Sequence, residues 1–251
     1  MPDGLGAALA APGLGWLGLV IFVAGIVRGF TGFGTGLIFV PIAGLFLPPA
    51  DCVLIMALTG LGSTITLLPE AWGRADRAEV FSLAIAASLA IPAGLWLLTS
   101  LNPETVRWAV ALVAGLTLLG LVSGWRYRGR VTGPGLAGVG FAAGLIGGMT
   151  GLTGPVVIFF YLAGTAAAAK VRANTVLFLA VLDLVVASGL FVAGQMRGET
   201  LWLSALLAGP YLIGTLVGKR LFDPARERAY RALAYGLIAL AVLSGLPIWE
   251  G

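Results

Sequence analysis

The chain has 251 residues, of which 59% are hydrophobic and only 10% charged, and its net charge is +4. Soluble domains are about 45–50% apolar and about 25% charged, so this composition excludes an ordinary soluble domain and predicts an integral membrane protein. One cysteine and no histidine offer no intrachain disulfide and no metal, haem or redox cofactor site, and the basic residues lie in short loops, where membrane insertion explains them without nucleic-acid binding.

The first part of the chain contains two short apolar runs on either side of a glycine-rich stretch. The N-terminus lacks the basic residues of a signal peptide, so we expect its apolar sequence to be retained. Residues 14–27 and 36–48 are shorter than the roughly 20 residues that cross a bilayer as a helix. Between them lies the stretch Gly-Phe-Thr-Gly-Phe-Gly-Thr-Gly, residues 29–36. We predict two half-helices that enter the membrane and return to the same side. Pro12 leaves open whether residues 5–27 instead cross fully.

Longer apolar runs follow, and the whole pattern then occurs a second time. Residues 52–69, 80–99 and 105–123 are each long enough to span the membrane. After a basic segment, short runs at 134–147 and 155–167 flank a second glycine-rich stretch, and long runs cover 173–194, 201–218 and 229–247. We predict six spanning helices and two broken helix pairs, divided into a first repeat (1–123), a cytoplasmic linker (124–132) and a second repeat (133–251).

The two glycine-rich stretches are similar in sequence. A shift of 119 positions places Gly29 on Gly148, Thr31 on Thr150 and Gly32 on Gly151. Each repeat contains a returning pair and three crossings, and an odd number of crossings inserts the second repeat upside down. Inverted repeats whose broken helices meet near the midplane are typical of secondary transporters. The predicted fold is therefore an all-α polytopic membrane protein with two inverted-topology repeats.

The charges of the loops predict the orientation in the membrane. If both short pairs return to their own side, twelve Lys and Arg residues share one side and two lie on the other. If each pair crosses once, the same residues divide eight to six. Because basic residues of short loops collect in the cytoplasm, we favour the first arrangement, in the cell membrane, with both termini outside the cytoplasm. The cytoplasmic set is then Arg74, Arg77, Arg126, Arg128, Arg130, Lys170, Arg172, Lys219, Arg220, Arg226, Arg228 and Arg231, against Arg107 and Arg197.

The paired motifs resemble those of a known transporter family. One half has Gly29-x-x-Gly32-x-Gly34-x-Gly36 followed by Pro41, and the other has Gly147-Gly148-x-x-Gly151-x-x-Gly154-Pro155. With the duplication and the length of the chain, this pattern is similar to the TauE/SafE family of sulfite and organosulfonate exporters. The resemblance implies a membrane permease for small anions, with sulfite, sulfoacetate and related sulfonates as the substrate class.

The chemistry of the two loops also favours an anion. A helix restarts near Gly36 and near Pro155, so its unpaired N–H groups and positive dipole end face the loop. Successive glycines allow backbone N–H groups to approach a ligand closely, and threonine hydroxyls add donors. The alternative is that these glycines serve only close helix packing. The expected substrate-binding residues are Arg28, Thr31, Gly32, Phe33, Gly34, Thr35, Gly36, Thr150, Gly151, Leu152, Thr153, Gly154, Pro155 and Tyr161.

Two charged residues near these loops stand out. Arg28 adjoins the first loop; it either contacts the substrate or, if residues 5–27 span fully, is an ordinary cytoplasmic anchor. Asp183 is the only acid deep within a predicted span, where acids commonly relay a proton or a cation. The alternative for Asp183 is a structural hydrogen bond to a neighbouring helix. We expect Asp183 to couple transport to a proton or sodium ion, with Thr64 at the matching position of the first repeat and Asn174 extending the polar path.

The sequence thus predicts an ion-coupled secondary transporter. An anion channel or an uncoupled uniporter could share the same loops but would need no coupling acid. An enzyme is not expected, because no nucleophile–base pair or metal cluster is evident. No P-loop is present for ATP hydrolysis within this chain.

Overall fold

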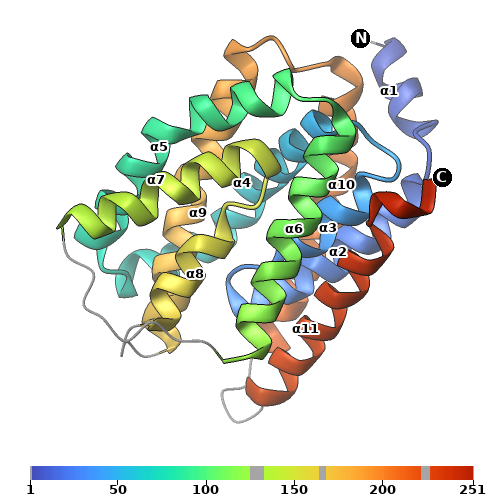
Figure 1. Ribbon diagram of the computed structural model, residues 1–251. Coiled ribbons are helices and arrows are strands. Elements are labelled where there is room, and N and C mark those ends of the chain that lie inside the picture. The colour runs from blue at the N-terminus through green and yellow to red at the C-terminus, as the bar shows by residue number, and fades with distance from the viewer. Residues whose placement is uncertain (1, 125–132, 164–167, 222–226, 251) are drawn as a thin grey trace.

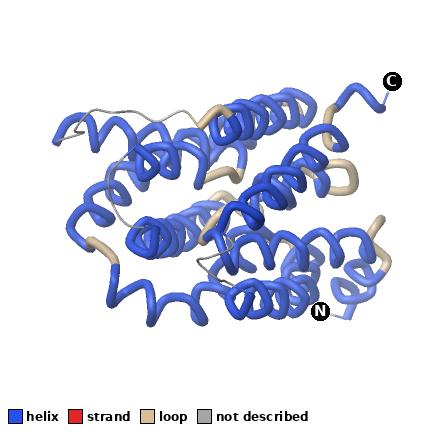
Figure 2. Tube along the Cα trace, turned by 90° about the horizontal axis from the view of Figure 1, so that it is seen from below, coloured by secondary structure: helices blue, strands red, loops and turns tan. Residues whose placement is uncertain are grey.

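The computed structural model describes residues 2–124, 133–163, 168–221 and 227–250, and within these ranges every regular element is a helix (Figures 1 and 2). The all-α prediction is confirmed for this part of the chain. The helices are α1 (Pro2–Leu9), α2 (Leu14–Thr31), α3 (Thr35–Ala43), α4 (Pro49–Arg74), α5 (Arg77–Ser100), α6 (Pro103–Val122), α7 (Gly133–Thr150), α8 (Gly154–Ala163), α9 (Ala168–Val192), α10 (Gly198–Leu221) and α11 (Glu227–Ser244), followed by a short 3₁₀ turn (Pro247–Glu250).

Within the described ranges, six helices are long and apolar enough to cross a membrane, as expected for a multi-pass membrane protein. Five of them, α4, α5, α6, α9 and α10, match predicted spans. The sixth is α2. The predicted span at 229–247 corresponds to α11, whose described apolar part is Ala232–Ser244. The six candidate spans are Leu14–Thr31, Pro49–Arg74, Arg77–Ser100, Pro103–Val122, Ala169–Val192 and Gly198–Leu221.

The half-helices predicted at 14–27 and 134–147 are longer in the structure, where α2 and α7 each have 18 residues. Gly29 and Gly148, which we expected in loops, lie inside these helices and serve close packing. A Cβ atom on Gly29 would lie 2.7 Å from Lys219 N, and one on Gly148 would lie 2.8 Å from the Ile91 carbonyl oxygen. In a membrane, such small residues allow helix backbones to approach. Residues 5–27 are not one continuous helix, since α1 ends before Pro12 and α2 begins after it.

Each long helix of a pair is followed by a short one that turns back. α3 has nine residues and α8 has ten. A Cβ atom on Gly13, at the start of α2, would lie 2.7 Å from the Phe46 ring, just beyond the end of α3. The chain therefore returns to the end from which α2 began. In Figure 1, α8 likewise turns back from the inner end of α7.

The element order is the same in both halves, with a long and a short helix followed by three more helices (α2–α6 and α7–α11). Close glycine contacts also occur in corresponding places. Gly25 of α2 lies against α10, where its Cβ would be 2.6 Å from the Tyr211 carbonyl oxygen. The corresponding Gly144 of α7 lies against α5, where its Cβ would be 2.7 Å from the Ala87 carbonyl carbon. The predicted linker lies outside the described residues, apart from Gly124.

Charged residues gather at two ends of the helix bundle. At the start of α4, Asp51 pairs with Arg197 and accepts a hydrogen bond from the Thr200 hydroxyl at 2.9 Å. Near the other end of α4, Glu70 lies among Arg74, Arg172 and Lys219. Asp51 and Glu70 are separated by 19 positions, about 29 Å along a helix, which is close to the thickness of a hydrocarbon core.

A second polar cluster lies at the Glu70 end, in the turn between α4 and α5. Asp76 accepts a hydrogen bond from Lys170 Nζ at 3.0 Å and one from the Glu79 N–H at 3.4 Å. These two donors hold the pKa of Asp76 below its ordinary value. The Asn174 side chain accepts from the Asp76 N–H at 2.8 Å and donates to Glu79 Oε1 at 3.1 Å. This cluster fixes the turn against the start of α9.

Candidate functional site

The two predicted glycine loops begin with the same backbone geometry, which supports the local duplication. α2 ends in Gly32 with φ 82°, and its N–H donates to the Arg28 carbonyl. α7 ends in Gly151 with φ 75°, and its N–H donates to the Gly147 carbonyl at 2.8 Å. A positive φ strongly favours glycine. Only three residues then separate each pair of helices, namely 32–34 and 151–153.

The hydroxyls of Thr31 and Thr150 are used by the loops themselves. Each donates to the carbonyl four residues earlier, Thr31 to Val27 and Thr150 to Ile146, both at 2.7 Å. Each also accepts from an N–H two residues later, at 3.2 Å. These side chains shape the turns, as threonine does elsewhere through local backbone bonds. Neither is among the residues that line the central cavity described next.

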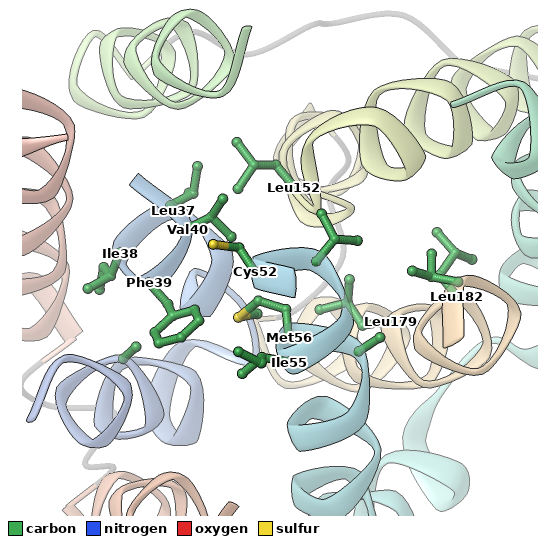
Figure 3. Packing of buried hydrophobic residues seen from close by; sticks show 14 of the residues in the cluster. Leu37, Ile38, Phe39, Val40, Cys52, Ile55, Met56, Leu152, Leu179 and Leu182 are labelled. Carbon is green, nitrogen blue, oxygen red and sulfur yellow. The ribbon is translucent and has the colours of Figure 1, made fainter. Parts of the chain in front are cut away.

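The loops meet at a small central cavity. A Cβ atom on Gly36 would lie 3.0 Å from Leu152 Cδ2, and one on Gly154 would lie 3.8 Å from Phe33 Cβ. The cavity between them has a volume of about 30 Å³. Figure 3 shows Leu37, Met56, Leu152 and Leu179 converging on this region from α3, α4, the second loop and α9. The full lining is Arg28, Phe33, Gly34, Thr35, Gly36, Leu37, Met56, Gly151, Leu152, Thr153, Gly154, Pro155, Leu179 and Asp183.

Two helix N-termini border this cavity. α3 begins at Thr35 and α8 at Gly154, and the first residues of both helices belong to the lining. The free N–H groups of a first helical turn and the helix dipole together amount to roughly half a positive charge at each terminus. Two such termini beside one cavity favour an anion.

The central cavity also contains one cation and one carboxylate. Arg28, from the last turn of α2, is 3% exposed, and Asp183 of α9 is 8% exposed. Their Nη2 and Oδ2 atoms are 3.9 Å apart, which is an ion pair and too long for a direct hydrogen bond. Arg28 Nε and Asp183 Oδ2 are buried without a hydrogen-bond partner among the described residues. Buried polar atoms are normally satisfied, so this pair has unused hydrogen-bonding capacity.

Neighbouring residues hold this pair in position. Arg28 Nη2 lies 3.5 Å from the Thr64 hydroxyl, which places Thr64 beside the site although it does not line the cavity. Gly60 of α4 makes room for the carboxyl, because a Cβ there would lie 2.9 Å from Asp183 Cγ. Thr35 shares a hydrogen bond of 2.9 Å with the hydroxyl of Tyr211. Tyr211 thereby links α10 to the start of α3.

Two of the expected site residues lie elsewhere. Asn174 belongs to the cluster around Asp76 and Glu79, nine positions before Asp183 on α9, and does not line the cavity. Tyr161 of α8 is 4% exposed and also lies outside the lining. Thr31, Gly32 and Thr150 flank the cavity without lining it.

Five residues at the site were not expected from the sequence: Leu37, Met56, Gly60, Leu179 and Tyr211. The first, second and fourth are apolar and cannot be told from ordinary core residues by pattern. Gly60 is one of 38 glycines. Tyr211 offered a signal, since a tyrosine in the middle of an apolar span commonly needs a polar partner for its hydroxyl.

Comparisons with known proteins identify the family of this chain. Residues 17–245 match the family model described as "Sulfite exporter TauE/SafE". A curated relative from Cupriavidus necator, the "Probable sulfite/organosulfonate exporter TauE", is 26% identical over 231 residues, which cover 87% of this chain and 90% of the relative. No solved structure matches the chain. Because the family model covers most of the chain, including both loops and Asp183, this protein belongs to the TauE/SafE family of membrane exporters.

Proposed function

We propose that this protein is a secondary transporter of the cell membrane that moves a small sulfur-containing anion, either sulfite or an organosulfonate such as sulfoacetate. The description of the family and the name of the C. necator relative support this substrate class. The observation that carries the proposal is the central cavity, where both glycine loops, two helix N-termini and a buried arginine meet.

The cavity has the chemistry to bind a sulfonate or sulfite group. Such a group has three oxygens and spreads its negative charge over them. Backbone N–H groups at the starts of α3 and α8 supply donors from two directions, and Arg28 supplies a full positive charge. Leu37, Met56, Leu152 and Leu179 keep the surroundings apolar, which strengthens these interactions.

Binding requires the site to widen. A cavity of about 30 Å³ has room for a water molecule or two but not for a sulfite ion. The two loops are connected to different helix pairs, so relative movement of these pairs changes the width of the cavity. Movement of one inverted repeat against the other around a midplane site is the usual basis of alternating access. We assign the two halves to such repeats, with both termini outside the cytoplasm.

The charges of the site explain how an ion would be coupled. Arg28 and Asp183 together are neutral, and an incoming anion would leave one negative charge in a buried site. A proton or sodium ion at Asp183 restores neutrality, because unbalanced charge is costly where the dielectric constant is low. Anion and cation therefore favour each other's binding. An anion channel or an uncoupled uniporter would not require a cation to balance the charge of the bound anion. Flux under an imposed ion gradient distinguishes a coupled transporter from these alternatives.

Equilibrium binding tests the site directly. We expect purified wild-type protein to bind sulfite or sulfoacetate, and Arg28→Ala to weaken binding by at least about tenfold, the size of a lost charged hydrogen bond. The matched control is Arg77→Ala, which removes an arginine that stacks on Trp72, 5.4 Å from the ring centre, away from the cavity. Equal binding by wild-type and Arg28→Ala proteins would remove the arginine from the site. If the wild type binds neither anion, the proposed substrate class is wrong.

A further inference from the structure

A second cationic site lies at the Glu70 end of the bundle. The carboxylate of Glu70 is approached by cations from three helices: Arg74 of α4 at 3.0 Å, Arg172 of α9 at 3.7 Å and Lys219 of α10 at 3.8 Å. Three positive charges around one negative charge leave an excess of two. A small depression beside them is lined by Leu67, Glu70, Ala71, Arg74, Ala169, Arg172, Ala173 and Val176.

Two of these cations are held in place independently of Glu70. Arg172 Nη2 donates to the Gly29 carbonyl at 2.8 Å, and Lys219 Nζ donates to the Thr66 carbonyl at 3.2 Å. Their distances to Glu70 are those of ion pairs without short hydrogen bonds. Removing or displacing the carboxylate would thus leave the positive charges where they are.

This cluster is directly connected to the first glycine loop. Arg172 bonds α2 at Gly29, and its Cγ lies beside Gly32, where a Cβ would come within 2.9 Å. On α9, Arg172 and Val176 face the depression, whereas Leu179 and Asp183 line the central cavity. The spacing of four, three and four residues keeps all four on one helical face. Arg172 and Asp183 are about 16 Å apart along that face.

The apolar wall of the depression comes from α4 and α9. Leu67, Ala71, Ala173 and Val176 form a small buried cluster between α4 and α9, distinct from the main core, and each is 2% to 4% exposed. Only two residues from each helix contribute to it. All four residues also line the depression.

We propose that the Glu70 cluster, at the end of the bundle where we predict the cytoplasm, is an entry site for small oxyanions, from which the anion reaches the central cavity along α4 and α9. Glu70 acts as an internal counter-ion that an incoming sulfite or sulfonate displaces from the three cations. The ligand class rests on the proposed function. Positive charges near the entrance of a site attract an anion and raise its local concentration, and this attraction weakens with added salt.

The test measures sulfite binding in an Arg28→Ala background, where the central site is weakened. Titrations at low and high ionic strength should show residual, salt-sensitive binding. Glu70→Gln should tighten it about two- to fivefold, as expected for one partly exposed charge. Arg74→Gln should weaken it by a similar factor. Combining Glu70→Gln with Arg74→Gln restores the net charge and should return the affinity to that of the background.

The matched control is Arg77→Gln, which removes the same charge three residues from Arg74 but outside the cluster. Unchanged affinity in this control, with opposite effects at Glu70 and Arg74, supports the entry site. No residual binding, or residual binding that Arg77→Gln changes as much as Arg74→Gln does, overturns it. These outcomes differ from failure of the central site, which would show as equal binding by wild-type and Arg28→Ala proteins.

Discussion

Arg28 and Asp183 lie 3.9 Å apart, Nη2 to Oδ2, in the central cavity that both glycine loops border. They come from α2 and α9, in different halves of the chain. Charged residues within membrane-embedded helices are costly, and those that are present commonly mark ion or substrate pathways. The pair brings together Arg28, the residue proposed to bind the anion, and Asp183, the proposed coupling acid.

Replacing Asp183 with Asn should separate binding from coupling. The amide keeps the shape and much of the hydrogen bonding of the carboxyl but cannot take up a proton or attract a sodium ion. We expect Asp183→Asn proteoliposomes to bind substrate and perform exchange, yet to fail to accumulate it under an imposed ion gradient. Asp51→Asn, which alters the acid paired with Arg197 at the far end of α4, should still accumulate substrate. Normal uphill accumulation by Asp183→Asn would make this acid structural.

The glycines of the two loops should differ in their tolerance of a side chain. Gly34 has φ 95° and Gly151 has φ 75°, so valine at either position is strained and should abolish sulfite binding while leaving expression largely intact. Gly154 has no positive φ, and a Cβ there has ordinary space. Gly154→Ala is therefore the control and should bind sulfite. Binding by purified Gly34→Val and Gly151→Val proteins would take the loops out of the site.

Thr31→Val and Thr150→Val should reduce stability more than affinity. Their hydroxyls hydrogen-bond the backbone of their own turns, and loss of such a bond costs about 1 kcal/mol. We expect a lower midpoint of thermal unfolding in detergent, with the Kd for sulfite within about threefold of the wild type. A large loss of affinity at unchanged stability would instead show that these hydroxyls contact the anion.

Much of the fold could be predicted because apolar length and glycine patterning are local signals. All six long runs became helices at nearly the predicted positions, and the offset of 119 residues correctly paired Thr31 with Thr150 in the same hydrogen-bonding role. The ends of α2 and α7 were missed because a glycine in a membrane sequence can break a helix or pack it closely. Gly29 does the second, and only its neighbours in space, Thr215 to Lys219, reveal this.

The candidate site was predicted in its parts but not in its arrangement. Most of both loops, Arg28 and Asp183 line one cavity, as their separate signals indicated. Asn174 shares a helix with Asp183, yet its side chain is taken up by Asp76 and Glu79 at the end of the bundle. Tyr161 follows the second loop in sequence but does not line the cavity. Position along the chain cannot show which way a helix turns a side chain after a tight loop.

The predicted sidedness can be tested by labelling with a membrane-impermeant maleimide. In a Cys52→Ser background, a cysteine placed after Gly251 should be labelled in intact cells, and one that replaces Gly129 should not, because the distribution of basic residues predicts a cytoplasmic linker. Labelling of the lysed cells supplies the control for reactivity at both positions. The reverse pattern would contradict the orientation, and labelling at both positions would indicate leaky cells.

Ion-driven flux through the wild-type protein tests the central claim most directly. Proteoliposomes would be loaded with a known concentration of sulfite or sulfoacetate, and the anion would be followed on both sides under an imposed proton or sodium gradient. A coupled transporter should move the anion until its electrochemical potential on one side exceeds that on the other, and the excess should collapse when an ionophore dissipates the driving gradient. Flux that stops at equal electrochemical potential of the anion, whichever gradient is imposed, would contradict coupling and identify a channel or uniporter.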